Sequence, residues 1–344
     1  MTTQADIPAA PRPGSDYARL SRKIADAGLL DRRPGYYAVR IGLVVAAYAA
    51  AWSVFAAVGD SWWTLAMAAV LAVVFAQVAL VAHDLAHRQV FRRRRPSEIA
   101  GRLAGNLGIG MSYGWWQDKH TRHHANPNHE ELDPDVAPDI LVWSERQASK
   151  AGGLTRIIAA RQAFLFFPLL TLEGFNLHVA GVRATLDPGL KRRHLELGLL
   201  LAHFAGYLAV VFSVLSPGKA IAFIVLHQAL FGIHLGCTFA PNHKGMPTLT
   251  AEDELDYLRK QVLTSRNVSG GALMDVALGG LNHQIEHHLF PNMPTPNLRK
   301  AKPIVRRHCA ELGIPYAETT LVESYRIALR HMHDVGEPLR SHAQ

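Results

Sequence analysis

Apolar residues are concentrated in two pairs of long runs. No Asp, Glu, Lys or Arg occurs in residues 41–59 or 61–82, and Asp60 alone separates these runs. The runs 197–218 and 220–241 form a second such pair, separated by one lysine. Each run approaches the roughly 20 apolar residues needed to cross about 30 Å of hydrocarbon. The pattern therefore predicts an all-α integral membrane protein with four transmembrane helices in two hairpins.

The remaining segments are polar enough to lie outside the membrane. We expect residues 83–196 and 242–316 to form a helical cap that completes one domain with the spans, from residue 37 to 316. Residues 1–36 form a polar N-terminal segment without the apolar core of a signal peptide, and 317–344 form a C-terminal helix and tail.

Positive charge predicts the orientation of the spans. Four arginines, 92–95, follow the second span, three basic residues, 191–193, precede the third, and the two tight turns contain only Lys219. By the positive-inside rule, both termini and the cap face the cytoplasm and the spans cross the cell membrane. This topology explains the net charge of +8, so no nucleic-acid partner is needed. The uncharged run 162–172 is too short to span, which indicates an interfacial helix.

Composition narrows the chemistry. The chain has 19 His but only two Cys, so it cannot form a disulfide framework, a cysteine-ligated zinc site or a four-thiolate iron–sulfur cluster. The histidines, in contrast, are clustered at spacings that place their rings on one face of a helix. The clustered residues are His83 and His87, His120, His123 and His124, and His287 and His288; His243, immediately after the fourth span, is the eighth candidate.

Eight imidazoles exceed the needs of one tetrahedral zinc but suit two metal ions with open positions. Iron binds imidazole and reduces O2, whereas zinc has no redox chemistry, so a di-iron centre is the best chemical fit. Neighbouring polar side chains are candidates to orient the rings. They are Asp84, Asn128, Asp133, Asp135, Asn242, Gln284 and Glu286.

Other histidines carry weaker signals. His203, His227 and His234 fall inside the predicted spans, where a histidine either takes part in function or bonds a neighbouring helix. His283 is out of phase with the cluster beside it. No role is assigned to the isolated histidines His129, His194, His308, His331, His333 and His342.

Three motifs, HDLAH at 83–87, HTRHH at 120–124 and QIEHH at 284–288, resemble in order the three histidine boxes of the membrane fatty acid desaturase family. The flanking sequences HHANPNHEELDPD, PNHKGMP and NHQIEHHLFPNMPTPNL are also similar, and the resemblance extends over residues 35–316.

The resemblance implies a function. The seven histidines of the boxes would ligate two irons, with His243 as a further ligand and Gln284 in the place of a histidine. The reaction would be O2-dependent insertion of a cis double bond into an acyl-CoA or acyl-lipid chain. The HPGG motif of the family's fused cytochrome b5 domain does not occur in this sequence. Electrons would therefore come from a separate NAD(P)H-dependent reductase with a ferredoxin or cytochrome.

Two alternatives remain open. A di-iron hydroxylase acting on an alkyl, sterol or carotenoid substrate would use the same boxes. A non-catalytic metal-binding receptor or transporter would instead line its spans with polar residues, and these spans contain few.

Overall fold

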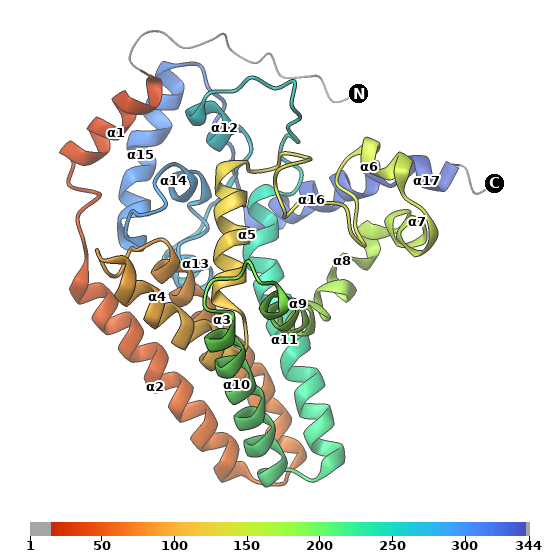
Figure 1. Cartoon of the computed structure of the whole chain (residues 1–344). Coiled ribbons are helices and arrows are strands. Elements are labelled where there is room, and N and C mark those ends of the chain that lie inside the picture. Colours follow the sequence, from red (N-terminus) through yellow and green to blue (C-terminus); the bar gives the residue numbers. More distant parts are fainter. Residues whose placement is uncertain (1–14, 342–344) are drawn as a thin grey trace.

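The computed structural model describes residues 15–341, which are almost entirely helical (Figure 1). Residues 1–14, at the start of the predicted N-terminal segment, and 342–344, with His342, lie outside the described residues. The described part confirms the predicted class of an all-α integral membrane protein with four long apolar helices.

Four helices have the length and composition of membrane spans, at the positions that the hydrophobic pattern predicts. They expose large apolar side chains, such as Leu43 and Leu201, as a lipid-facing surface requires. The spans are α2 (Pro34–Val58), α3 (Leu65–Ala86, preceded by the 3-10 turn η1, Trp62–Thr64), α10 (Arg193–Val214) and α11 (Pro217–His243).

The two hairpin turns lie together at the end of the molecule opposite the cap (Figure 1). Gly59 ends α2 with φ +69°, a conformation that favours glycine. The Asp60 carboxylate accepts a hydrogen bond from the Ser216 N–H at 2.9 Å and pairs with Lys219 Nζ at 3.2 Å. These contacts hold the two turns side by side.

Helices α3 and α11 form the inner pair of the bundle, and α2 packs on α3. The ring of Phe75 on α3 packs against that of Phe231 on α11 at 5.8 Å, and Phe55 on α2 contacts Phe223 at 4.8 Å. Because α3 and α11 are the more buried helices, their ends fix the positions of the residues that follow them.

The remaining helices lie before, between and after the spans. Helix α8 follows α7 at a bend of 103°, so neither forms an unbroken span, and the interfacial position of residues 162–172 stays a prediction. The bounds are α1 (Asp16–Asp26), α4 (Arg94–Arg102), the π-helix η2 (Leu103–Gly108), α5 (Tyr113–Ala125), α6 (Glu145–Lys150), α7 (Gly153–Ala159), α8 (Gln162–Leu170), α9 (Glu173–Leu186), α12 (Tyr257–Leu263), α13 (Ala272–Ala277), α14 (Gln284–Leu289), α15 (Thr295–Glu311), α16 (Leu321–Val335) and α17 (Glu337–Ser341).

Two strands of two residues each pair in parallel, β1 (Asn267–Val268) with β2 (Glu318–Thr319). The Asn267 side chain accepts a hydrogen bond from the Ile285 N–H at 2.9 Å and donates one to Glu286 at 2.8 Å. This short pairing thereby holds α14, which carries the third histidine motif.

The start of α5 is held by the fully buried carboxylate of Glu196 on α10. Its oxygens accept hydrogen bonds from the Ser112 hydroxyl at 2.6 Å and the Gly114 N–H at 3.0 Å. Arg102 completes a buried ion pair with Glu196 at 3.0 Å. A paired, hydrogen-bonded charge of this kind fixes the position of α5, which carries the second histidine motif.

Candidate metal centre

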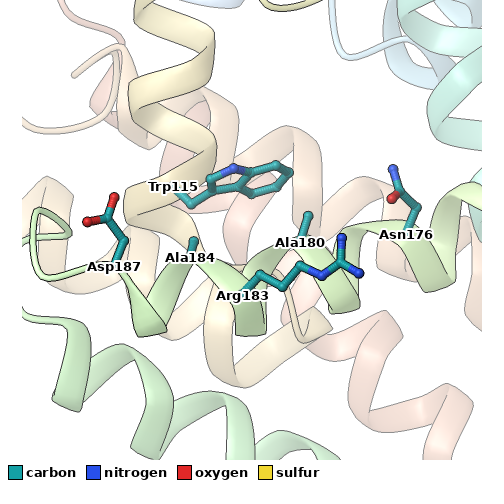
Figure 2. Close-up of a pocket in the computed structure, with 6 residues that line it drawn as sticks. All are labelled: Trp115, Asn176, Ala180, Arg183, Ala184 and Asp187. Carbon is teal, nitrogen blue, oxygen red and sulfur yellow. The ribbon is translucent and has the colours of Figure 1, made fainter. Parts of the chain in front are cut away.

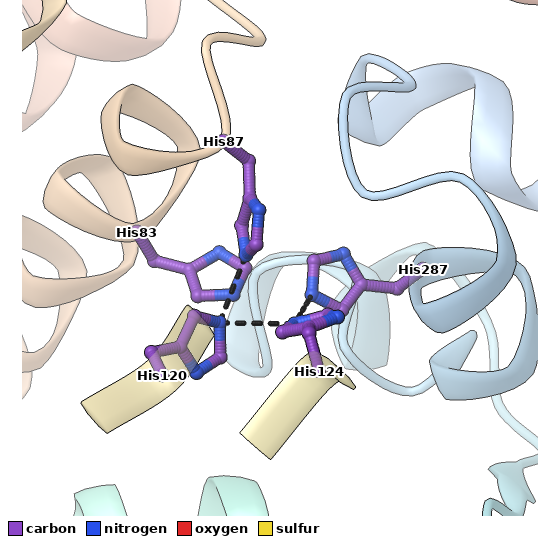
Figure 3. Close-up of side chains that lie close together, drawn as sticks. All are labelled: His83, His87, His120, His124 and His287. Atoms are coloured by element: carbon purple, nitrogen blue, oxygen red, sulfur yellow. Dashed lines mark hydrogen bonds between the residues drawn. The ribbon is translucent and has the colours of Figure 1, made fainter. Parts of the chain in front are cut away.

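The fold brings all eight clustered histidines together where α3 and α11 reach the cap. The five-histidine group comprises His83, His87, His120, His124 and His287, which offer ligand atoms within 4.8 Å of one another (Figure 3). The three-histidine group comprises His123, His243 and His288, with ligand atoms equally close together. Four segments of the chain contribute: the end of α3, α5, the end of α11, and α14.

Paired histidines in the sequence distribute their rings between the two groups. His123 and His124 are consecutive, as are His287 and His288, and in each pair one ring enters each group. Successive residues of a helix point about 100° apart, which explains the division. The rings of His124 and His288 stack at 4.2 Å with an interplanar angle of 18°, so the two groups are adjacent.

Within the five-histidine group the Nε2 atoms face one another (Figure 3). The Nε2 atoms of His87 and His120 are 2.8 Å apart, and those of His124 and His287 are 3.1 Å apart. Burial, with the neighbouring imidazoles adding to it, holds the pKa of His120, His124 and His287 well below its usual range. These rings are therefore neutral at physiological pH and can direct lone pairs to a shared cation.

In the three-histidine group a separate acceptor fixes every Nδ1 atom. His123 donates to the Asp133 carboxylate, His243 to the Thr264 carbonyl oxygen and His288 to the Gln261 Oε1 atom. Each distance is 2.9 Å. Such partners set the tautomer and leave the Nε2 lone pair available.

The pKa of His123 differs from that of the other rings. Burial lowers it, but the carboxylates of Asp133 and Asp135 together outweigh burial and raise it above the usual range. The Asp135 carboxylate forms an ion pair with Lys119 at 2.8 Å and lies 3.5 Å from His123 Nδ1. Its charge is thus shared between a lysine and the three-histidine group.

The residues present fit bound metal ions. Both ring nitrogens of His83 and the Nε2 atom of His288 are buried without a hydrogen-bond partner among the described residues. An unpaired buried nitrogen is costly unless something absent from the polypeptide binds it. Two neighbouring sets of imidazoles, with these ring nitrogens unpaired, match the donor set of two transition-metal ions.

Several predicted orienting residues contact the three-histidine group. The Asn128 N–H donates to Asp133 at 2.7 Å, and its side chain donates to the His243 carbonyl oxygen at 3.0 Å. The Gln284 side chain lies 2.9 Å from His243 Nε2, against the atom that would face a metal. Asn242 contacts Gln284 at 3.4 Å.

The two other carboxylates form their hydrogen bonds and shortest ion pair with residues outside the two histidine groups. Asp84 pairs with Arg40 at 2.7 Å, and its oxygen lies 3.6 Å from His83 Nδ1. Glu286 accepts hydrogen bonds from Asn267 and from the Tyr316 hydroxyl, at 2.8 and 2.7 Å. Burial raises the pKa of Glu286 to about 7. Asp84 thereby connects α3 to α2, and Glu286 connects α14 to β1.

Sequence reasoning missed Gln261, Thr264 and Arg266. The guanidinium of Arg266 is buried and donates to the Pro241 carbonyl oxygen at 2.6 Å and to that of Lys244 at 2.9 Å. It thereby satisfies carbonyl groups at the end of α11, next to His243. None of the three lies in a motif, so the sequence contains no signal for them.

The histidines of the spans belong to neither group. His203 Nδ1 donates to the Leu107 carbonyl oxygen at 2.9 Å, and the Tyr207 hydroxyl lies 2.9 Å from His227 Nδ1. His234 Nε2 lies 3.4 Å from the Ala277 carbonyl oxygen. These contacts connect neighbouring segments, so the three histidines fit the second of the two predicted roles, that of bonding a neighbouring helix.

Two surface clefts lie near the centre. One, of about 380 Å³, lies between α5 and α9 and includes Trp115 and Arg183 but none of the eight histidines (Figure 2). The other, of about 450 Å³, is lined in part by His87 and His124. Of these two clefts, the second is the one lined by rings of the five-histidine group.

Comparisons with known proteins agree with this geometry. The family described as "Fatty acid desaturase" matches residues 60–320. The chain is 30% identical to an acyl-lipid (9-3)-desaturase of Physcomitrium patens, over 88% of this chain and 59% of that protein. It is 29% identical to fatty acid desaturase 3 of Bos taurus, over 88% of this chain and 68% of that protein. It is 26% identical to a Delta(8)-fatty-acid desaturase of Helianthus annuus, over 94% and 75%. The chain thus spans from about three fifths to three quarters of the length of these relatives.

Proposed function

We propose that this chain, which belongs to the fatty acid desaturase family, inserts a double bond into the acyl chain of a lipid or thioester. The observation that carries the proposal is the pair of adjacent histidine groups at the ends of the two inner spans. The relatives are named as desaturases of acyl lipids and fatty acids, which supports this substrate class.

The five-histidine group and the three-histidine group would each hold one iron ion. Bound iron would supply the means to reduce O2 and to remove hydrogen from an unactivated CH2 group. Burial lowers the pKa of His120, His124 and His287 and thereby favours their neutral form. The protein also fixes the rings of His123, His243 and His288 through their Nδ1 partners, so the donor atoms are in place before the metal binds.

The position of the centre suits an acyl substrate. Because His83 lies at the end of α3 and His243 at the end of α11, an acyl chain in the membrane can approach the centre without crossing water. The reaction converts one CH2–CH2 unit, one O2, two electrons and two protons into one CH=CH unit and two waters. We infer that the cap, the centre and both termini face the cytoplasm, as the basic residues flanking α3 and α10 favour.

The electrons must come from outside the histidine centre. The two cysteines, Cys237 and Cys309, are both free thiols and cannot hold a cluster. We therefore propose a separate NAD(P)H-dependent reductase with a ferredoxin or cytochrome as the source. Purified protein supplied with NADPH alone should be inactive.

Fatty-acid profiling of a host with and without this chain tests the function. We expect a new alkene that requires O2 and whose double-bond position can be read by mass spectrometry. Purified protein should contain two iron ions per chain. A hydroxy acid without alkene would contradict the proposal in favour of hydroxylation.

A further inference from the structure

The cleft of about 450 Å³ is lined by two rings of the five-histidine group. His87 and His124, both half-buried, line its inner end, and Gln117 and Thr121 on α5 form one side. His83 and His287 of the same group are fully buried. The cleft therefore exposes ring edges of the candidate metal centre to the surface.

The cleft is strongly basic. Three arginines line it: Arg32 between α1 and α2, and Arg88 and Arg92 between α3 and α4. Among the residues that the structure describes, neither Arg88 nor Arg92 forms an ion pair, and both are exposed. Burial, together with the nearby charges of Arg92 and Arg88, lowers the pKa of Arg32. No carboxylate lines the cleft, so it offers uncompensated positive charge.

The backbone holds Arg88 at the cleft in an uncommon conformation. Its φ is +55°, in the left-handed region that a residue with a Cβ seldom adopts. The Arg88 carbonyl oxygen accepts a hydrogen bond from the Arg32 guanidinium, which ties two of the three arginines together. Strained non-glycine residues of this kind concentrate at functional sites.

The lining excludes an acyl chain as the occupant. Ala86 and Pro291 are its only apolar residues, and the others are Arg, His, Gln, Thr and Asn. An acyl chain that passed through would lose contact with apolar surface and desolvate these polar groups. An anionic protein surface, in contrast, would pair with the arginines.

We propose that this basic cleft is the docking surface for a small acidic electron-carrier protein, whose electrons reach the centre through the ring edges of His87 and His124. The inference rests on the proposed function, which consumes two electrons per double bond. Two reduced one-electron carriers are each oxidised once. Their electrons, with two protons from solvent and two hydrogens from the acyl chain, reduce O2 to two waters.

The test compares the double variant Arg88→Glu/Arg92→Glu with the control Arg307→Glu. Arg307 is exposed on α15, makes no ion pair among the described residues and does not line the cleft. The probe is an acidic plant-type [2Fe–2S] ferredoxin, and binding to the detergent-solubilised full chain is measured at low and high salt. Metal content and thermal stability are checked for each variant.

We expect the double variant to bind ferredoxin about tenfold or more weakly than wild type, with the difference reduced at high salt. The control should bind like wild type. In turnover, the KM for ferredoxin should rise by a similar factor while the KM for the acyl substrate stays unchanged. Unchanged ferredoxin affinity would overturn the proposal. So would a raised KM for the acyl substrate alone, which would assign the arginines to a phosphate of the substrate head group.

A single turnover separates this inference from the proposed function. Wild type and the double variant are reduced with dithionite in the absence of ferredoxin and exposed to O2 with acyl substrate. Equal alkene yields support docking as the step affected. No alkene from wild type would contradict desaturation, while the binding measurement would still decide whether the cleft recognises an acidic carrier.

Discussion

The two histidine groups share peptide segments but are built differently. Each ring of the three-histidine group has a hydrogen-bond acceptor at Nδ1, whereas the Nδ1 atoms of His83, His124 and His287 in the five-histidine group have no partner among the described residues. There the rings are held by one another and by stacking, as between His120 and Trp116 at 4.5 Å. The three-histidine group thus offers few metal-ligand nitrogens, each held in a fixed position. The five-histidine group offers more ligand nitrogens than one metal ion needs from the protein, and it is open to the surface.

The largest loss of bound iron and of desaturation should follow from removing a ring of the three-histidine group. His288→Ala leaves two imidazoles, fewer than the three protein ligands usual for a catalytic metal. We expect the iron content to fall from two ions to one and desaturation to fall about a thousandfold or more, beyond the loss expected for an orienting partner alone. Metal analysis and product yield measure both. Two irons retained in His288→Ala would show that this group does not hold an ion.

Removing a ring of the larger group should be less damaging to metal binding. His120→Ala leaves four imidazoles, so we expect lower iron affinity and a loss of turnover of about a hundredfold. The same two measurements apply, with His129→Ala as a control because His129 belongs to neither group. If His120→Ala turned over substrate as fast as wild type, His120 would not be a metal ligand and the assignment of the five-histidine group as a metal site would be wrong.

The contrast between the groups also shows what a sequence can reveal. Spacing identified seven of the eight histidines, because ligands that share a helix recur every three or four residues. His243 stands alone in the sequence and is proposed from its place after the fourth span and from the family resemblance. Spacing could not divide the histidines between two groups, since that depends on how α3, α5 and α14 cross. Nor could it find Gln261 or Thr264, because each acts through one atom, and the Thr264 atom is a backbone carbonyl that any residue provides.

The spans were predictable for a different reason. The hydrophobic pattern predicts α2, α3, α10 and α11 because lipid constrains every residue of a span. The strand pair β1–β2 was not predictable, because its two residues per strand give no pattern. The carboxylate of Glu196 was equally hidden, since its partners Ser112 and Gly114 lie far away in the chain.

The hydrogen-bond acceptors at Nδ1, which distinguish the three-histidine group from the five-histidine group, can be tested directly. Gln261→Leu removes the acceptor of His288 Nδ1, and iron affinity of the three-histidine group should fall about tenfold. Gln261→Glu keeps an acceptor oxygen and should restore most of that affinity. Titration with Fe(II) measures both. If the Leu and Glu variants bind iron equally, the Nδ1 partner does not set the affinity of this group.

The smallest effect predicted for a single ring is its contribution to the acid sensitivity of the metal-free protein. His87, His120, His124, His287 and His288 have a lowered pKa in the folded protein, so the unfolded chain binds more protons and stability is lost as the pH falls below about 6.5. Each such histidine costs about 1.4 kcal/mol at one pH unit below that value. His123 opposes the trend, because its raised pKa contributes stability at low pH.

Thermal unfolding of metal-free protein in detergent, from about pH 7.5 to about pH 5.5, measures the net effect of these opposing pKa shifts on stability. Four of these five acid-sensitive rings belong to the five-histidine group, so His124→Phe should flatten the pH profile. The variant Asp133→Asn should steepen it, because it removes the charge that raises the pKa of His123. A wild-type profile that rises toward low pH would mean that the His123 pair outweighs the larger group, and would reverse the order of acid sensitivity inferred for the two groups.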